Sequence, residues 1–296
     1  MTLTIDGLLR QDSVRLVETL LLSQQEARLE VHMLLARSLG VARVWLIAHD
    51  DAQLSSHQLL LYQTLLDRRL AGEPMAYILG EREFFGMTLH VNSHVLIPRP
   101  DTELLVEQAL AYLPVNQSAS ILDLGTGSGA IALAIAQARP LAQVLAVDIS
   151  EDALQVAMHN AVRLSLSNVV FLQSNWWRSI PAQKFDLIVS NPPYVAKDDQ
   201  HVRQGDLRFE PIGALTAGVK GLDDLRCIIS AAPAWLAHRH APAWLAHGNA
   251  LMLEHGWTQA ESVRQLLVAA GFSLIATERD LSGCERMTHA VWKHKA

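Results

Sequence analysis

A short run after an apolar stretch, Asn191-Pro192-Pro193-Tyr194, contains residue types that could hold a planar amino group. The side-chain carbonyl of Asn191 and the main-chain carbonyl of Pro192 are acceptors, and two prolines would keep both in place. Two acceptors can bind both hydrogens of one NH₂ group, while the ring of Tyr194 can cover the flat face of its π system. Amide and aromatic amino nitrogens are poor nucleophiles, so fixing their orientation beside an electrophile is the help that they need. We therefore predict catalysis and substrate binding at residues 191–194; a strand-ending turn with a stacked tyrosine is the alternative.

A glycine-rich turn lies earlier, in "ILDLGTGSGAIALAIA", between an apolar run and a helical pattern. Its glycines let the backbone turn sharply and approach a ligand closely, because no Cβ stands in the way. The helix that begins near Gly129 is expected to direct free N–H groups and partial positive charge at that ligand. No Gly-Lys-Ser/Thr is present, so this is not a nucleoside-triphosphate loop. We predict cofactor binding by Gly125, Thr126, Gly127, Ser128 and Gly129, with a tight strand-to-helix turn as the alternative.

Asp148 ends the next apolar run, "QVLAVD", nineteen residues after Gly129. An acid at this place can accept hydrogen bonds from ribose hydroxyls. The alternative is an aspartate that only caps the following helix. A glycine turn and an acid at this spacing together indicate a nucleoside-containing cofactor more strongly than either alone.

The residues around these motifs predict the sheet that positions them. The runs "SILDLG", "QVLAVD", "NVVFLQ", "FDLIVSN" and "NALMLEHG" are typical of buried strands, and helical patterns separate the first three. The ending, "FSLIATERDLSGCERMTHAVW", reads as two more strands around a turn, which predicts an antiparallel edge. We expect an α/β fold with a doubly wound, mostly parallel seven-stranded sheet and helices on both faces. The glycine turn, Asp148 and Asn191 each follow a strand, so they should meet at the carboxyl ends of the sheet, where such folds bind ligands.

Three parts are predicted along the chain. Residues 1–72 form a small helical domain, because "SVRLVETLLLSQ", "ARLEVHMLLARSLG" and "SSHQLLLYQTLLDRRLAG" repeat apolar residues at spacings of three and four. "MAYILGEREFFGMTLHV" mixes aromatic and β-branched residues around Gly80 and Gly86, which suggests a hairpin linker over residues 73–98. Residues 99–296 form the sheet domain.

The amino-acid composition limits the classes of function that the protein can have. The chain has 296 residues, 50% of them apolar and 18% charged, with a formal net charge of −6. This acidic balance argues against a protein that mainly grips a phosphate backbone. Two cysteines without metal-ligand spacing suit a reducing compartment, and neither a signal peptide nor a long apolar span is read. We expect a cytoplasmic protein with no metal and no membrane association.

The motifs "DLGTGSG", "VDIS" and "NPPY", in this order, resemble S-adenosylmethionine-dependent methyltransferases that modify planar amino groups. "LIPRPDTE", "DLRFEP", "LEHGW" and the helical domain in front are similar to those of the release factor glutamine methyltransferases. The resemblance covers nearly the whole chain. It implies a class I, Rossmann-like methyltransferase domain that converts S-adenosyl-L-methionine to S-adenosyl-L-homocysteine. The methyl group would go to the side-chain amide nitrogen of the glutamine in the Gly-Gly-Gln motif of class I peptide-chain release factors. Because residues 1–72 contain no motif like a nucleotide site, we predict that they recognise this protein partner.

The same resemblance implies roles for single residues. Residues 125–129 would cradle the methionine part of the cofactor, Asp148 its ribose and Trp176 its adenine. Asn191, beside the cofactor, would hold the glutamine amide together with Pro192, Pro193 and Tyr194. Arg99 and Pro100 would belong to a segment that closes over the site. We expect a monomer with no stable nucleic-acid partner.

Three residues are left without a catalytic role. Asn175 stands before Trp176 where the family usually has aspartate, so its contact with adenine is open. For Arg208 and Glu210 a structural ion pair fits as well as a catalytic role, so no catalysis is assigned to them.

Two other functions fit parts of the pattern. An amino-group methyltransferase acting on adenine or cytosine could use the same Asn-Pro-Pro-Tyr run after base flipping, although a basic recognition domain is missing. A non-catalytic, S-adenosylmethionine-binding regulatory protein is the second, and the intact run 191–194 speaks against it.

A tandem copy interrupts the sheet domain: "APAWLAH" occurs at residues 232–238 and again at 241–247. Nine residues of helix turn by about 900°, half a turn out of phase, and Pro242 would break a continuous helix. We expect one copy to pack and the other to form a surface excursion near residues 239–247, away from Asn191. The duplication also explains the histidines around "HRH" without metal binding.

Overall fold

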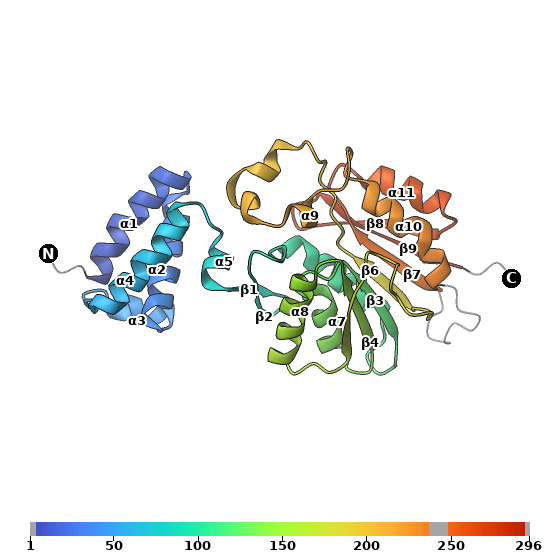
Figure 1. The fold of residues 1–296 in the computed structure, drawn as a ribbon, viewed down its shortest axis with the longest axis horizontal. Coiled ribbons are helices and arrows are strands. Elements are labelled where there is room, and N and C mark those ends of the chain that lie inside the picture. The colour runs from blue at the N-terminus through green and yellow to red at the C-terminus, as the bar shows by residue number, and fades with distance from the viewer. Residues whose placement is uncertain (1–3, 237–247, 294–296) are drawn as a thin grey trace. The chain divides into compact units, whose positions relative to one another are not determined.

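The computed structural model describes residues 4–236 and 248–293 and contains two compact units (Figure 1). The first comprises Met1–Gly80 together with Gly205–Phe209, and the second comprises Glu81–Gln204 and Glu210–Ala296. No helix in the described ranges is both long and apolar enough to cross a membrane.

The first unit is a helical bundle. It contains α1 (Ile5–Leu20), α2 (Gln24–Leu39), α3 (Arg43–Ala48), α4 (Ser56–Leu70) and α5 (Met75–Leu79). Ser23 begins α2 with a capping box that includes Glu26, and Ser55 begins α4 in the same way with Gln58, so both helices have their first N–H groups satisfied. Leu16, Val31, Leu34, Leu35 and Tyr62 are fully buried in the bundle core.

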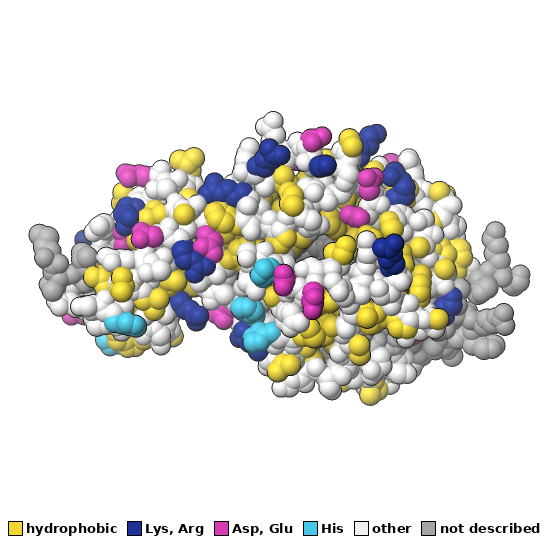
Figure 2. Space-filling view, in the orientation of Figure 1, with side chains coloured by type: hydrophobic (Ala, Val, Ile, Leu, Met, Phe, Trp, Pro, Cys, Tyr) yellow, Lys and Arg dark blue, Asp and Glu magenta, His cyan; other side chains and the backbone are white. Residues whose placement is uncertain are grey.

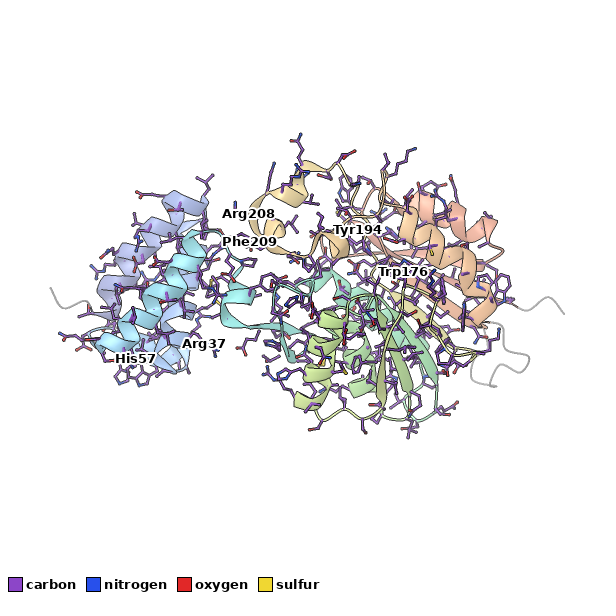
Figure 3. All side chains as sticks on the ribbon, viewed as in Figure 1. Arg37, His57, Trp176, Tyr194, Arg208 and Phe209 are labelled. Atoms are coloured by element: carbon purple, nitrogen blue, oxygen red, sulfur yellow. The ribbon has the colours of Figure 1, made fainter. Side chains whose placement is uncertain are left out.

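A late segment of the chain belongs to this helical unit. The short helix η3 (Gly205–Phe209) is held by Asp206, which pairs with the buried Arg69 at 3.2 Å. Arg208 donates to the main-chain oxygen of Ala71 at 2.8 Å and stacks over Phe209 (Figure 3). Of the two interpretations left open for Arg208 and Glu210, the structural ion pair between them is not the arrangement found, because Arg208 bonds a main-chain carbonyl and lies over a ring instead.

The second unit contains the predicted seven-stranded sheet, in the order β5-β4-β3-β6-β7-β9-β8. Its five parallel strands pair as β5·β4·β3·β6·β7, and β9 joins β7 and β8 in antiparallel fashion. The strands are β3 (Ser120–Leu124), β4 (Gln143–Asp148), β5 (Val169–Gln173), β6 (Leu187–Ser190), β7 (Asn249–Glu254), β8 (Ser273–Arg279) and β9 (Glu285–Trp292). The predicted fold class, including its antiparallel edge, is confirmed.

Helices cover both faces of this sheet (Figure 1). Ile121, Val144 and Leu187 point to the face of α6 (Glu103–Tyr112), α7 (Ala130–Ala138) and α8 (Glu151–Arg163). The adjacent residues Leu122 and Leu145 point to the opposite face, under α10 (Asp223–Leu236) and α11 (Ala260–Ala269). Successive residues of a strand face opposite sides, so a sheet covered twice needs the unbroken apolar runs seen in the sequence.

The expected hairpin is narrower than the sequence suggested. Only β1 (Glu81–Phe84) and β2 (Met87–His90) pair, with their turn at Phe85 and Gly86. The preceding "MAYIL" is the helix α5, which ends at Gly80 in the left-handed conformation with φ 76°. A left-handed glycine is a usual way to end a helix, so Gly80 separates the two elements.

Residues 232–236 of the first copy of the tandem repeat lie in α10, where Ala232 and Leu236 are fully buried. Trp235 of this copy stacks on Trp177, with ring centroids 5.8 Å apart. The second copy, 241–247, and the predicted excursion near 239–247 lie outside the described residues.

Candidate active site

The predicted motifs follow neighbouring strands of the sheet. Leu124 at the end of β3 pairs with Val147 of β4 on one side and with Ser190 of β6 on the other. The glycine turn, Asp148 and Asn191 therefore leave the sheet side by side. A pocket of about 400 Å³ lies there, a volume within the usual range for small-molecule sites. The predicted residues that line it are Gly125, Gly127, Asp148, Trp176, Asn191 and Pro193.

The glycine turn is tightly bonded within the protein. The N–H groups of Gly125 and Thr126 both donate to Val147, and that of Gly129 donates to the Thr126 carbonyl. The N–H of Gly127 donates to the Asp148 carboxylate at 2.9 Å. Of the N–H groups at the start of the helix that were expected to point at a ligand, that of Gly129 is therefore already used within the turn. At Gly125 and Gly127 a ligand in the pocket can approach the backbone of the turn closely.

Two glycines give the turn its shape. Gly127 has φ +55°, and a Cβ there would meet no protein atom within 4 Å, so the pocket space in front of it is left for a ligand. Gly125 has φ +75°, and a Cβ there would contact the Trp176 ring at 3.4 Å. Both positions favour glycine because side-chain-bearing residues seldom adopt positive φ.

The other three residues of the turn are not part of the described pocket lining. The Thr126 hydroxyl donates to the buried Asp123 at 2.7 Å. The Ser128 carbonyl accepts from Asn160 at 2.9 Å, and a Cβ at Gly129 would press against Leu133. These residues stabilise the turn through contacts within the protein. Contact between them and the cofactor stays a prediction.

Asp148 connects two loops. One carboxylate oxygen accepts from Gly127 and the other from the N–H of Ser150, each at 2.9 Å. The N–H of Ile149 also contacts this carboxylate, and since its two oxygens together have about four lone pairs, capacity for a ligand hydroxyl is left. Burial raises the pKa of Asp148, and these hydrogen bonds oppose the increase. The residue fits the ribose of a nucleoside cofactor and also fixes the turn that would hold the rest.

Trp176 forms one wall of the pocket, beside Asn175. Its backbone is left-handed, with φ 50°, and its indole N–H donates to Asp224 at 3.1 Å. Trp176 and Tyr194 both come from loops that follow strands of the sheet unit (Figure 3). A fixed aromatic wall beside polar groups suits the flat base of a nucleoside.

Side-chain hydrogen bonds to two buried residues hold the Asn191–Tyr194 corner in place. The side-chain nitrogen of Asn191 donates to the Thr102 hydroxyl at 3.1 Å, and the Tyr194 hydroxyl donates to Glu254 at 3.2 Å. Pro192 is buried, and neither it nor Tyr194 is in the described pocket lining. Asn191 and Pro193 line the pocket, and substrate contact by Pro192 and Tyr194 stays a prediction.

Two of these bracing residues were not identified as site residues from the sequence. Thr102 is 4% exposed and Glu254 is 1% exposed. Burial raises the pKa of Glu254 to about 7, against hydrogen bonds from Thr102 and Tyr194 that lower it. A signal was present, since Thr102 lies in the run "RPDTE" and Glu254 in "LEHGW", but only the fold shows that Thr102 bonds Asn191 and Glu254 bonds Tyr194.

Glu210 fixes a segment beside the pocket. Its carboxylate accepts the N–H of Ile97 at 3.0 Å and pairs with Arg99. Its ion-pair partner is thus Arg99, at 33% side-chain exposure, and not Arg208. Val95 and Leu96, just before this anchor, line the pocket. Closure of the segment over a ligand stays a prediction.

Among residues 4–236 and 248–293, no three histidine, cysteine, aspartate or glutamate side chains lie close enough together to hold a metal ion.

Two family models match the chain. Residues 14–80 match the PrmC N-terminal domain, and residues 100–207 match the methyltransferase small domain. The second match contains the glycine turn, Asp148 and the Asn191–Tyr194 corner.

Curated relatives match almost end to end. The release factor glutamine methyltransferase of Bordetella pertussis is 48% identical over 92% of this chain and 98% of its own length. The chain belongs to the release factor glutamine methyltransferase family. The Escherichia coli protein of the same name is 45% identical over 90% of this chain and 92% of its own.

A solved structure supports the fold. A methyltransferase from Pyrococcus furiosus is 17% identical, has a TM-score of 0.52 and covers 77% of this chain and 97% of its own. At this identity the likeness shows the fold alone. The predicted resemblance to the release factor glutamine methyltransferase family is confirmed by the relatives.

Proposed function

We propose that this protein methylates the side-chain amide nitrogen of the glutamine in the Gly-Gly-Gln motif of class I peptide-chain release factors, with S-adenosyl-L-methionine as donor. One observation carries the proposal: Asn191 and Pro193 line the same pocket as Gly125, Gly127 and Asp148. A corner suited to an amide group and a turn suited to a nucleoside cofactor therefore share one space. The near full-length relatives agree with this function.

The pocket fits this cofactor by the chemistry of its walls. Gly125 and Gly127 would let its methionine part lie against the backbone, Asp148 would accept from the ribose, and Trp176 would flank the adenine. When bound, S-adenosyl-L-methionine supplies an electrophilic methyl group on a positively charged sulfur. The product would be S-adenosyl-L-homocysteine.

The Asn191–Tyr194 corner would orient the acceptor. The Asn191 amide oxygen and the Pro192 carbonyl accept the two N–H groups of the glutamine amide, which directs its nitrogen at the methyl carbon. As the N–C bond forms and the bond between the methyl carbon and sulfur breaks, the nitrogen would become positive, and these two acceptors would stabilise that charge until one N–H proton passes to water. Tyr194 would cover the flat face of the amide, while its hydroxyl stays bound to Glu254.

The helical domain, residues 1–72, would recognise the protein around the Gly-Gly-Gln motif, with residues 73–98 as linker and 99–296 as the methyltransferase domain. Val44 and Ile47 of α3 lie one helical turn apart and are 73% and 69% exposed. Replacing both with serine in the full chain should weaken methylation of an intact release factor. Methylation of a short Gly-Gly-Gln peptide should not change, and equal loss on both substrates would contradict the role.

Mass spectrometry tests the reaction directly. After incubation with the protein and S-adenosyl-L-methionine, the Gly-Gly-Gln peptide of a release factor should gain one methyl group on glutamine. Radiolabelled transfer to DNA or RNA instead would favour the nucleic-acid alternative. On the face shown in Figure 2, basic side chains are scattered among acidic and apolar ones, which gives that alternative no continuous basic surface. Cofactor binding without transfer to any substrate would favour the regulatory alternative.

A further inference from the structure

Asp224 is a carboxylate in the pocket to which the proposed reaction gives no role. It lies in the first turn of α10 and lines the pocket together with Trp176 and Asp148. In the part of the chain that the structure describes, no lysine, arginine or histidine forms an ion pair with it, and Asp223 beside it is a second acid. A half-buried carboxylate usually has a cationic partner, so the place of Asp224 in the pocket calls for a reason.

The indole ring of Trp176 is held at two opposite edges. At one edge its N–H donates to Oδ1 of Asp224 at 3.1 Å. At the other edge, Cζ3 lies 3.4 Å from the place that a Cβ on Gly125 would take. The main-chain oxygen of Trp176 accepts from the Ser174 hydroxyl at 2.7 Å, which stabilises its left-handed backbone. The ring therefore reaches from the glycine turn to the start of α10, and Asp224 lies at its N–H edge.

The chemistry of a carboxylate limits what Asp224 can bind at this edge. An ionised carboxylate only accepts, and its two oxygens have about four lone pairs, of which the indole N–H uses one. Adenine joined to a ribose has one donor, its 6-amino group, and its ring nitrogens are acceptors. Burial raises the pKa of Asp224, the indole hydrogen bond lowers it and Asp223 raises it further. A second donor at the carboxylate would favour its ionised form.

We propose that Asp224 determines the specificity for the base of the cofactor: its carboxylate accepts the 6-amino group of adenine while it holds the Trp176 ring. The inference rests on the proposed function, in which the adenine of S-adenosyl-L-methionine lies against Trp176. The competing explanation is that Asp224 only stabilises the N-terminus of α10, as acids in a first turn do. Asp223 lies in the same turn, but its side chain is 63% exposed and outside the described pocket lining. It is therefore the matched control.

Calorimetry with two ligands tests the proposal in the full-length protein. One ligand is S-adenosyl-L-homocysteine, and the other is its analogue with hydrogen in place of the 6-amino group. The wild type should bind the analogue about tenfold to a hundredfold more weakly, because a hydrogen bond to a charged group is lost. Asp224→Ala should bind S-adenosyl-L-homocysteine more weakly and distinguish the two ligands by less than about threefold. Equal affinities of the wild type for the two ligands would overturn the proposal.

Three further variants show which group recognises the base. Asp223→Ala removes the same charge from the same turn and should keep the wild-type preference for the amino-bearing ligand. Trp176→Phe keeps an aromatic wall without the indole N–H, so it should weaken the binding of both ligands and keep the preference. Asn175→Ala should also keep it, although Asn175 lines the same pocket. If the preference vanished in Asn175→Ala and persisted in Asp224→Ala, the proposal would be overturned.

The binding measurements separate this inference from the proposed function, because they need no methyl transfer. A wild type that prefers the amino-bearing ligand through Asp224 but leaves the Gly-Gly-Gln glutamine unmethylated refutes the substrate and leaves the inference standing. An active wild type whose Asp224→Ala variant keeps the full preference refutes only the inference. If Asp224→Ala does not fold, Asp224→Asn decides. Its neutral amide accepts more weakly than a carboxylate, so its preference should be smaller, and an unchanged preference overturns the proposal.

Discussion

The main-chain oxygen of Tyr194 occupies the place that a Cβ on residue 221 would need. Gly221 has φ +67° and leaves this space open. Gln259 holds the same oxygen from its side-chain nitrogen at 2.9 Å. The position of the Asn191–Tyr194 corner therefore depends on residue 221 having no side chain. It depends as well on the hydrogen bonds to Thr102 and Glu254.

Gly221→Ala should displace Tyr194 and destabilise the protein. Gly86→Ala is the matched control, because Gly86 has a similar φ of +74° but no atom within 4 Å of the added Cβ. Both variants carry the strain of positive φ, and only the first forces atoms to overlap. We expect Gly221→Ala to lose about 1–3 kcal/mol more unfolding free energy than Gly86→Ala in urea titrations. Equal losses would show that the Tyr194 contact is readily relieved.

Asn191→Ala should separate catalysis from cofactor binding. Losing the acceptor that orients the glutamine amide should lower single-turnover methyl transfer by about a hundredfold or more. Calorimetry should show a largely unchanged cofactor affinity. Asn175→Ala, in the same pocket beside Trp176, should keep a near wild-type rate at saturating cofactor. More than half the wild-type rate in Asn191→Ala would refute its role.

Asp148→Ala should act mainly through cofactor affinity. The ribose hydroxyls would lose charge-assisted hydrogen bonds that contribute about 1.5–3 kcal/mol each, so the Kd should rise at least about tenfold. Gly127 and Ser150 would also lose their acceptor, which adds to the effect. Glu151→Ala, exposed at the start of α8, should leave the calorimetric Kd unchanged. An unaltered Kd in Asp148→Ala would contradict the assignment.

Asp123 should make stability depend on pH. Burial raises its pKa from 3.8 to about 7, so between these values the folded state binds a proton that the unfolded state has released. Stability from this group is complete below about pH 4 and is lost as the pH rises to about 7. The unfolding free energy of the wild type, relative to Asp123→Asn, should fall over that window and then level off. A pH-independent difference between the two would show that Asp123 titrates normally.

Deleting residues 232–240 should preserve activity. The deletion joins Ala231 to Ala241, so the second "APAWLAH" takes the place of the first in the sequence. Its alanine and leucine then stand at the positions at which Ala232 and Leu236 are buried in the core. Loop shortening of this size changes closure entropy little. Near wild-type cofactor affinity and methyl transfer are expected. Loss of folding or cofactor binding would show that both copies are needed.

The sheet could be predicted well because each strand is a short, continuous apolar run with clear limits in the sequence. "QVLAVD" is bounded by a helix on each side, and β4 has those limits, Gln143–Asp148. The helix α5 was predicted less well, since "MAYIL" combines an aromatic and a β-branched residue in five positions. Packing of Tyr77 and Ile78 into buried positions outweighs that local preference.

The candidate site, too, could be predicted only in part. Gly125, Asp148 and Asn191 were found because their spacing along successive strands carries the information. Thr102 and Glu254 are 152 positions apart, and no periodicity connects them. The wrong partner for Glu210 has the same origin, because Arg208 is its neighbour in sequence while Arg99 is its neighbour in space.

The position of β9 makes the site depend on residues 285–292, which come after every other strand of the sheet in the sequence. β9 is inserted between β7 and β8, and its Met287 pairs with Glu254. A chain that stopped before Glu285 would leave β7 as an open edge, with unpaired N–H and C=O groups that invite aggregation. Such a chain would also lack Arg286 beside Glu254. Premature termination within this gene should therefore yield inert, insoluble protein instead of a partly active enzyme.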